Sequence, residues 1–264
     1  MPDAYFTATD DAWFVPTDYC RGPWDADSCH AGPPSGLLAR AMERALASAG
    51  SGQRLVRIAI DLERPVPMAG FSIRTEIVRA GRSMTTLRAI LLDGDAKQRC
   101  VANGLALRAD LDRPLPTAAT AAHDPQAATP GGFVFDRTVH GLRCFTDSVE
   151  MRYPPGEDPT PGPTSVWMRS LPLLAHETPS PMQRICPLAD CGNALSRNAE
   201  PWDVGFVNAD LTLVLHREPD GEWLGSRSVS HWQPGGIGLS SATLFDRHGD
   251  VGHALQTLLL RPAV

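Results

Sequence analysis

Four segments of the chain have the pattern of β-strands joined by short turns. Residues 54–65, 71–83, 84–95 and 98–108 are rich in Val, Ile, Leu and Thr, and their apolar and polar positions partly alternate. Such alternation is typical of a strand with one buried face. The breaks between the segments are turn-like, and the Asp-Gly-Asp break at residues 93–95 suits a hairpin. The pattern therefore predicts four consecutive antiparallel strands.

The stretch before these strands, residues 29–46, begins as a turn of small and rigid residues and continues as a helix. Pro33 and Pro34 suit the first positions of a helix, where a missing N–H costs nothing. The helix is apolar over most of its circumference. Its apolar positions are Leu37, Leu38, Ala41, Met42, Ala45, Leu46 and Ala49, and its narrow polar stripe consists of Arg40, Glu43, Arg44 and Ser48. Because only the stripe can face water, we expect an α+β unit in which a curved antiparallel sheet wraps around this central helix, which is the hotdog fold.

The same unit is predicted a second time, at an offset of 153 residues. Arg64 in LERP matches Arg217 in LHREP (217 − 64 = 153), and Asp93 matches Asp246 at the same offset. The further matches are Pro34 with Pro187, Leu105 with Leu258, Leu107 with Leu260 and Arg108 with Arg261. Several matches in one ungapped register indicate duplication. We therefore expect two tandem copies, over residues 34–108 and 187–261.

The two halves are predicted to meet near the middle of the chain. Residues 109–132 are rich in Ala, Pro and Thr and have almost no large apolar side chain, which is typical of a connector. The expected organisation is an N-terminal hotdog unit over residues 1–112, a connector over 113–132 and a C-terminal hotdog unit over 133–264. The predicted fold is thus a double hotdog.

Composition and charge exclude several classes of function. With 42% hydrophobic and 20% charged residues among 264, the chain has the composition of a globular protein. The formal charge is −6 and the basic residues are scattered, so nucleic acid is not an expected partner. The N-terminal segment is acidic where a secretion signal needs positive charge, and no segment has the length of a membrane span. We expect no membrane partner and a cytoplasmic location.

The six cysteines indicate neither a metal centre nor a disulfide framework. They form no C-x-x-C pair, and Cys186 and Cys191 have no nearby His at zinc-ligand spacing. We therefore expect reduced thiols in the core and predict no metal site.

A series of longer motifs resembles one protein family. The motifs are HAGPPSGLLARAMERA, LERPVPMAG, EIVRAGRS, WMRSLPL, NADLTLVLHREPDGEWLG and GDVGHALQTLLLR. In this order and spacing the chain resembles the TesB-like acyl-CoA thioesterases in their single-chain, double-hotdog form, over nearly its whole length outside the connector. The resemblance implies hydrolysis of an acyl-CoA thioester to a free acid and CoA, with acyl-CoA as the partner molecule and no cofactor. Because larger assemblies are common in the family, a homo-oligomer is a further expectation.

The resemblance also implies a set of catalytic residues in the second half. PLADCGNAL supplies the family's carboxylate as Asp190, and HALQTLLLR supplies its glutamine as Gln256. The third position, where the family usually has Thr, is Asn208 in this chain. An Asn amide can still bond a water or the carboxylate. Thr212 is four residues further along the same strand and is a poorer substitute.

The duplication offers a check on these residues that does not depend on the family. Subtracting 153 from 190, 208 and 256 gives Leu37, Leu55 and Asn103. A carboxylate in a place that the other copy fills with leucine is partly desolvated, which is how acid–base groups are tuned. There are structural alternatives for both residues. Asp190 continues the solvated stripe of its helix, or it lies in the first turn after Pro187, where the helix dipole favours an acidic residue. Gln256 is an ordinary strand residue that faces solvent.

The expected mechanism is direct attack of water on the thioester. Asp190 acts as general base, Asn208 and Gln256 hold the water, and backbone N–H groups at a helix N-terminus polarise the carbonyl. The turn at Gly32 is the predicted N–H donor or acyl pocket, and His30 beside it is a candidate substrate contact, although a lone His near Pro and Gly is more often a surface residue. A covalent serine hydrolase is disfavoured because the chain has no G-x-S-x-G motif.

Two other functions remain open at this point. Hotdog proteins also act as hydratases and dehydratases, but the chain has neither a D-x-N-P-x-H nor an H-x-x-x-G-x-x-x-x-P motif. A non-catalytic module that binds acyl chains or acyl-CoA is the alternative from another class, with the change from Thr to Asn as a sign of lost activity. Thiol release from acyl-CoAs distinguishes the enzyme from the binding module.

Overall fold

A computed structural model describes all residues except 1–3, 10–11, 119, 122, 135–139 and 263–264. The first unit has one long helix and four long strands, as predicted, preceded by two short strands that the hydrophobic pattern did not reveal. Its elements are β1 (Phe6–Ala8), β2 (Trp13–Pro16), η1 (Asp18–Cys20), α1 (Gly32–Ser48), β3 (Arg54–Leu62), β4 (Phe71–Arg79), β5 (Met84–Leu92) and β6 (Gln98–Leu107).

The second unit repeats the four long strands and has a shorter, broken helix. Its elements are η2 (Pro125–Ala127), β7 (Thr129–Gly131), η3 (Phe145–Ser148), β8 (Glu150–Tyr153), β9 (Thr164–Arg169), α2 (Pro181–Ala189), α3 (Gly192–Leu195), β10 (Val204–Asn208), β11 (Asp210–Leu215), β12 (Leu224–Trp232), β13 (Ile237–Asp246) and β14 (Gly249–Pro262). The segment predicted as a connector, residues 113–132, contains η2 and β7. Its last part belongs to the second unit, because β7 pairs with β8. Residues 119 and 122 of that connector lie outside the described residues.

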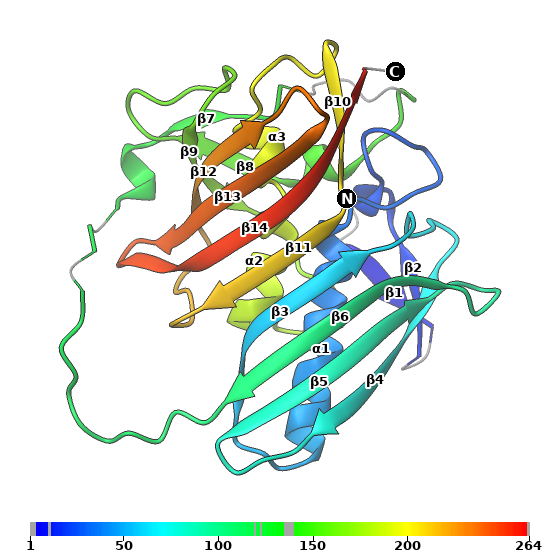
Figure 1. Cartoon of the computed structure of the whole chain (residues 1–264), viewed down its shortest axis with the longest axis vertical. Coiled ribbons are helices and arrows are strands. Elements are labelled where there is room, and N and C mark those ends of the chain that lie inside the picture. Colours follow the sequence, from blue (N-terminus) through cyan, green and yellow to red (C-terminus); the bar gives the residue numbers. More distant parts are fainter. Residues whose placement is uncertain (1–3, 10–11, 119, 122, 135–139, 263–264) are drawn as a thin grey trace.

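The strands of both units form one continuous antiparallel sheet (Figure 1). Its order is β1-β2-β4-β5-β6-β3-β11-β14-β13-β12-β9-β8-β7, with β10 pairing with β14. The halves join where β3 pairs with β11, from Asp61 opposite Asp210 to Arg57 opposite Val214. We call this β3–β11 pair the seam. Helices α1 and α2 lie on the same side of the sheet and pack against each other, so the double hotdog is confirmed.

The 153-residue offset holds for most of the duplicated unit. β4 and β12 begin at residues 71 and 224 and end at 79 and 232, and β5 and β13 begin at 84 and 237. Each seam strand is also interrupted at a matching place. The β3–β6 register shifts between Leu55 and Arg57, and Ala209, which matches the intervening residue 56, separates β10 from β11.

The last strand departs from the ungapped register, and this changes the counterpart of Gln256. Gly104 pairs with Leu87 on β5, whereas Gln256 pairs with Ser240 on β13, and residues 87 and 240 differ by 153. The offset on the last strand is thus 152 (256 − 104), because the hairpin before it is one residue shorter in the second unit. The expected match with Asn103 is wrong, and the counterpart is Gly104, whose close neighbours are Met42 and Leu55.

The polar stripe predicted to face water on α1 is half buried by the second unit. Arg40 is only 7% exposed, and its guanidinium binds the carboxylate of Glu177, with Nε 2.6 Å from Oε2. Glu43 accepts hydrogen bonds from Ser180 and Gln183 at the start of α2. The expectation failed here because the stripe was judged against one unit alone, whereas the second helix covers it.

The counterpart of α1 is interrupted just before the predicted carboxylate. Pro187 lies inside α2 rather than at the start of a helix, and it removes the N–H that would bond to residue 183. α2 ends at Ala189, with Asp190 as its C-cap, and α3 begins at Gly192. Asp190 therefore does not occupy the first turn of its own helix.

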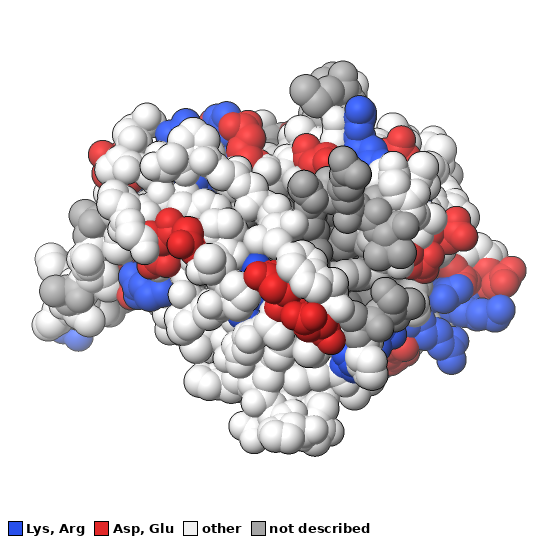
Figure 2. Space-filling view, turned by 90° about the horizontal axis from the view of Figure 1, so that it is seen from above, with Lys and Arg blue, Asp and Glu red and all other residues white. Residues whose placement is uncertain are grey.

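The remaining expectations about the core and the surface can be compared directly. All six cysteines are free, and five of them are buried. On the face shown in Figure 2, acidic and basic side chains are interspersed. Within the described part of the chain, the structure has no helix with the length and apolar character needed to cross a membrane.

Candidate active site

A cavity of about 430 Å³ lies at one end of the seam, where both units contribute to its walls. The first unit supplies the loop before α1 and the residues that follow β3, including His30 and Arg64. The second unit supplies Asp190, which follows α2, and Asn208, the last residue of β10. We call this the Asp190 cavity. Two of the three predicted catalytic residues line it, and the third, Gln256, lies directly behind Asp190.

Asp190 is buried at the break between α2 and α3, with 4% of its surface exposed. Its Oδ1 accepts two amide hydrogen bonds, one from Asn208 Nδ2 and one from Gln256 Nε2, both at 2.9 Å. Its Oδ2 lies 3.2 Å from Nδ1 of His30 in the other unit. The solvated-stripe alternative is therefore wrong. Because Oδ1 already has two donors, Oδ2 is the oxygen left for proton transfer.

Gln256 is fully engaged in holding the helix break together. Its Nε2 also donates to the backbone oxygen of Asp190 at 2.9 Å, and its Oε1 accepts the backbone N–H of Asn193 at 3.1 Å. The side chain is 1% exposed, so the alternative of a solvent-facing Gln256 is wrong as well. Because both ends of the amide bind protein groups, Gln256 positions the carboxylate and is not free to hold a water.

Asn208 differs from Gln256 because one of its two polar side-chain atoms has no hydrogen-bond partner among the described residues. Its Nδ2 donates to Asp190, while its Oδ1 is buried and has no hydrogen-bond partner among the described residues. A buried acceptor without a partner is costly unless a water or ligand satisfies it. Thr212 does not compete for this role, because its neighbours Leu211 and Leu213 face the core and strand side chains alternate in direction.

His30 contacts the carboxylate itself, which the sequence did not predict. Its Nδ1 accepts the backbone N–H of Gly32 at 3.1 Å, and its ring stacks on Phe145 at a centroid distance of 4.1 Å. The Nδ1 atom thus contacts both the Gly32 N–H and the Asp190 carboxylate. The stack and the Gly32 contact together fix the ring plane beside Asp190.

Burial shifts the two ionisable groups in opposite directions, each toward its neutral form. Desolvation raises the pKa of Asp190, an effect that the nearby His30 and the bonds from Asn208, Gln256 and the Gly32 backbone reduce. Desolvation lowers the pKa of His30, and the Asp190 charge opposes this. A carboxyl group with a raised pKa and a neutral imidazole in contact form a proton-transfer pair.

We expected Gly32 at an exposed helix N-terminus that opens to the substrate pocket, but the structure places it in the interior. It is buried, and a Cβ at this position would lie 2.5 Å from the backbone oxygen of Pro187. Glycine is thus required because α1 and α2 approach each other closely here. Its N–H points to the His30–Asp190 pair, so Gly32 supports that pair and does not line the cavity.

A polar interior behind Gln256 was also missing from the sequence predictions. Ser226, Ser228 and Ser230 alternate along β12 and are buried, and Ser230 donates to Asn193 Oδ1 at 3.0 Å. Trp232 Nε1 donates to the same oxygen at 3.0 Å. The period-two spacing of serines in LGSRSVSHW was a usable signal, because serines on the buried face of a strand need polar partners. In the described part of the chain, no cluster of His, Cys, Asp and Glu could hold a metal ion.

Family models and solved structures agree with this architecture. A model described as an acyl-CoA thioesterase N-terminal domain matches residues 20–109, and one described as an acyl-CoA thioesterase C-terminal domain matches residues 116–260. A search of curated protein sequences finds no match to this chain.

Among solved structures, a protein from Novosphingobium aromaticivorans is 19% identical, with a TM-score of 0.75 over 99% of each chain. The acyl-CoA thioesterase II TesB2 from Mycobacterium marinum is 16% identical, with a TM-score of 0.65 over 97% of this chain and 96% of that one. A protein with a hot dog fold from Alicyclobacillus acidocaldarius is 14% identical, with a TM-score of 0.72 over 99% and 98%. These identities establish the shared fold, and the two domain models establish that the chain belongs to the acyl-CoA thioesterase family.

Proposed function

We propose that this protein hydrolyses acyl-CoA thioesters in the Asp190 cavity by direct attack of water. The observation that carries the proposal is the buried Asp190, whose Oδ1 is held by two amides while its Oδ2 faces a histidine from the other unit. A buried carboxylate held in this way is a suitable general base, because its orientation is fixed and its pKa is raised toward neutrality.

The reaction needs one water and one proton acceptor. Asn208 Oδ1 accepts a hydrogen bond from the water, and Asp190 takes a proton as the water oxygen attacks the thioester carbonyl carbon. The carbon–sulfur bond then breaks, and the proton passes from Asp190 to the departing sulfur. The products are a carboxylic acid and the CoA thiol, and no covalent enzyme intermediate forms.

His30 is the residue that we assign to the carbonyl oxygen. Once Asp190 has taken the proton from water, Nδ1 can accept a hydrogen bond from it, and the ring's own proton on Nε2 is then available to the substrate. A neutral donor of this kind stabilises the negative charge that develops on the thioester oxygen. The lowered pKa of His30 keeps the imidazole neutral, so that one ring nitrogen donates while the other accepts.

The lining of the cavity matches the two ends of an acyl-CoA. Arg64 and Arg261 lie in its wall, and guanidinium groups are suited to phosphate oxygens. Phe133, Phe145 and Phe206 also line it and offer an apolar surface to an acyl chain. The sequence expectation of an acyl-CoA partner is thus supported by side chains of both required kinds.

The decisive experiment compares the wild-type protein with Asp190→Asn on a panel of acyl-CoAs of varied chain length, with a thiol reagent as readout. Asn keeps the size of the side chain but cannot accept the proton, so turnover should fall about 10²–10⁴-fold while acyl-CoA binding is retained. Asp95→Asn, in the exposed hairpin after β5, is the matched control and should leave turnover unchanged. Full turnover in Asp190→Asn would refute the assignment of the base. Tight binding of acyl-CoA by the wild type without thiol release would favour the non-catalytic binding module instead.

A further inference from the structure

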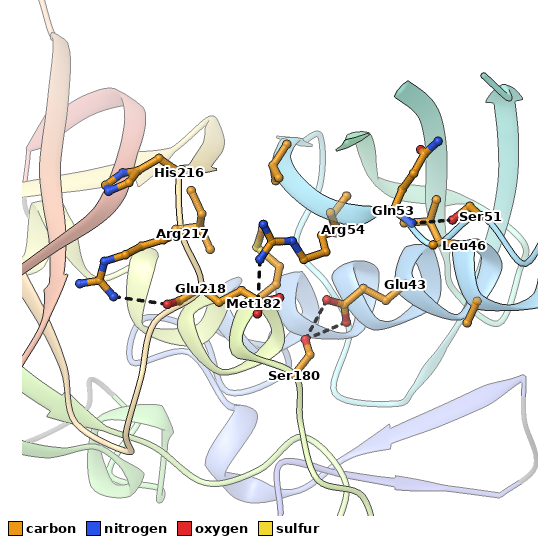
Figure 3. A pocket seen from close by; sticks show the side chains of 15 residues that line it. Glu43, Leu46, Ser51, Gln53, Arg54, Ser180, Met182, His216, Arg217 and Glu218 are labelled. Carbon is orange, nitrogen blue, oxygen red and sulfur yellow. Dashed lines mark hydrogen bonds and ion pairs between the residues drawn. The ribbon is translucent and has the colours of Figure 1, made fainter. Parts of the chain in front are cut away.

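A second cavity, of about 400 Å³, lies at the opposite end of the seam (Figure 3). Its walls come from the segments that match those of the Asp190 cavity. Residues 53–55 correspond to 206–208, and residues 215–218 correspond to 62–65, at the 153-residue offset. The two cavities are therefore related by the pseudo-two-fold axis of the duplicated fold. We call this second space the Glu43 cavity.

A carboxyl group from one unit meets polar groups from the other in this cavity as well. Glu43 on α1 accepts hydrogen bonds from Ser180 Oγ at 2.8 Å and from Gln183 Nε2 at 2.6 Å. Gln183 belongs to α2 of the second unit, so the partner of Glu43, like the partner of Asp190, comes from the other unit. Figure 3 shows Glu43 and Ser180 meeting beneath Arg54.

The hydrolytic residues, in contrast, are missing from this end of the seam. The counterparts of Asp190 and Asn208 are Leu37 and Leu55, and the counterpart of Gln256 is Gly104. Glu43 lies six residues beyond Leu37 on α1, and its carboxylate is already bound by protein groups. A thioester held here would meet no carboxylate in the position of Asp190 and no amide in the position of Asn208.

The lining nevertheless combines polar and apolar groups in the way that a pantetheine arm requires. Gln53 Oε1 is buried without a hydrogen-bond partner among the described residues, while its Nε2 donates to Gly81 at 2.7 Å. Gln53 also lines the cavity, so this acceptor is available to an amide N–H when the side chain turns toward the ligand. Leu46, Leu55, Val56, Met182 and Leu215 supply apolar wall. A pantetheine arm alternates amides with methylene groups and so uses both kinds of surface.

We propose that the Glu43 cavity is a second binding site for the pantetheine arm of CoA or an acyl-CoA, which it holds without hydrolysing. The ligand class rests on the function proposed for the Asp190 cavity, because pseudo-symmetry carries the ligand from one end of the seam to the other. One chain would then bind two CoA-type molecules and hydrolyse only one of them.

The test measures binding stoichiometry with S-hexyl-CoA, a thioether that lacks the carbonyl and cannot be hydrolysed, by isothermal titration calorimetry of the full chain. The wild type should bind two equivalents per chain. Ala47→Trp places an indole from an exposed position of α1 into the Glu43 cavity and should bind one equivalent, with acyl-CoA turnover within about twofold of wild type. Ser48→Trp, on the neighbouring exposed position outside the lining, is the matched control and should bind two.

A second measurement needs no substitution. Hydrogen exchange of the wild type with and without S-hexyl-CoA should show protection of residues 43–56 and 215–218 as well as of the Asp190 cavity. One equivalent bound by the wild type, two bound by Ala47→Trp, or no protection of these segments would each overturn the second site. The hydrolysis assay separates the two proposals, since turnover with one equivalent bound refutes only the second site, and two equivalents without turnover refute only the catalytic proposal.

Discussion

The two halves of this protein share a backbone plan but have interiors of opposite character. In the first half α1 is continuous, and Leu37, Leu55 and Gly104 contribute to an apolar core. In the second half the helix is interrupted at Asp190, and the matching positions are a carboxylate and two amides that bond to one another. The comparison teaches that the fold tolerates a buried polar site in one copy when the other copy supplies an ordinary core.

The helix break is the structural feature that permits this difference. In a continuous helix the backbone groups at residues 190 and 193 would bond within the helix. Here Gln256 accepts the N–H of Asn193 and donates to the backbone oxygen of Asp190. A single side chain thus replaces local helix bonds and orients the carboxylate at the same time.

Replacing Gln256 with Leu tests this link most severely and is expected to have the largest effect on stability. The variant leaves the Asn193 N–H and the Asp190 backbone oxygen buried without partners, which should cost about 2–4 kcal/mol of unfolding free energy. Turnover should also fall, because Asp190 Oδ1 loses one of its two donors. Urea denaturation and the thiol assay measure the two effects.

Thr257→Ala is the matched control for Gln256→Leu, since Thr257 is the next residue on β14 and faces solvent. Its unfolding free energy should change by less than about 0.5 kcal/mol. If Gln256→Leu unfolds at the same urea concentration as the control, the amide does not hold the helix break.

Gly104→Ala makes the smaller, reciprocal change in the first half. The added Cβ would lie 2.5 Å from Met42 Sδ and 3.1 Å from Leu55 Cδ1, so those side chains must move. The expected destabilisation is about 1–2 kcal/mol, with turnover unchanged because the Asp190 cavity is untouched. Asn103→Ala, which is exposed on the same strand, should be neutral in the same denaturation experiment. Equal stability of the two variants would show that Gly104 is not required by packing.

The smallest predicted effect is a pH dependence of stability that Asp190 alone contributes. Its pKa is raised in the folded protein, so the folded state binds the proton more tightly than the unfolded state. The stability from this group is present at low pH and is lost as pH rises through the folded pKa. Asp190→Asn should therefore gain thermal stability relative to wild type as the pH rises from about 4 through the folded pKa of Asp190.

His30 titrates in the opposite sense, because its pKa is lowered by burial. The comparison should therefore be repeated in a His30→Gln background, where only Asp190 remains of the pair. A difference in melting temperature that stays constant across the pH range in both backgrounds would show that folding does not raise the pKa of Asp190.

The sequence predicted the parts of the fold that depend on local pattern. The four long strands of the first half begin at the predicted residues 54, 71, 84 and 98, because alternating Val, Ile, Leu and Thr report directly on a half-buried strand. The short strands β1 and β2 carry too few residues for such a pattern. The shortened hairpin at Asp246 escaped notice because one missing residue leaves the apolar positions looking aligned.

The candidate site was predictable in its residues but not in its contacts. Family motifs pointed to Asp190, Asn208 and Gln256, and the structure brings all three together. The contact of His30 with Asp190 joins two units and has no local signature in the sequence. For the same reason the stripe on α1 was judged solvent-facing, although Arg40 and Glu43 bind groups of the second unit.

The Asp190 cavity is lined by residues of both units, and this has a consequence for the order in which the site forms during synthesis. His30 precedes Asp190 by 160 residues and Gln256 by 226 residues along the chain, so the first half is synthesised with a histidine that has no carboxylate to face. The site is complete only after β14, the strand that carries Gln256, has joined the sheet.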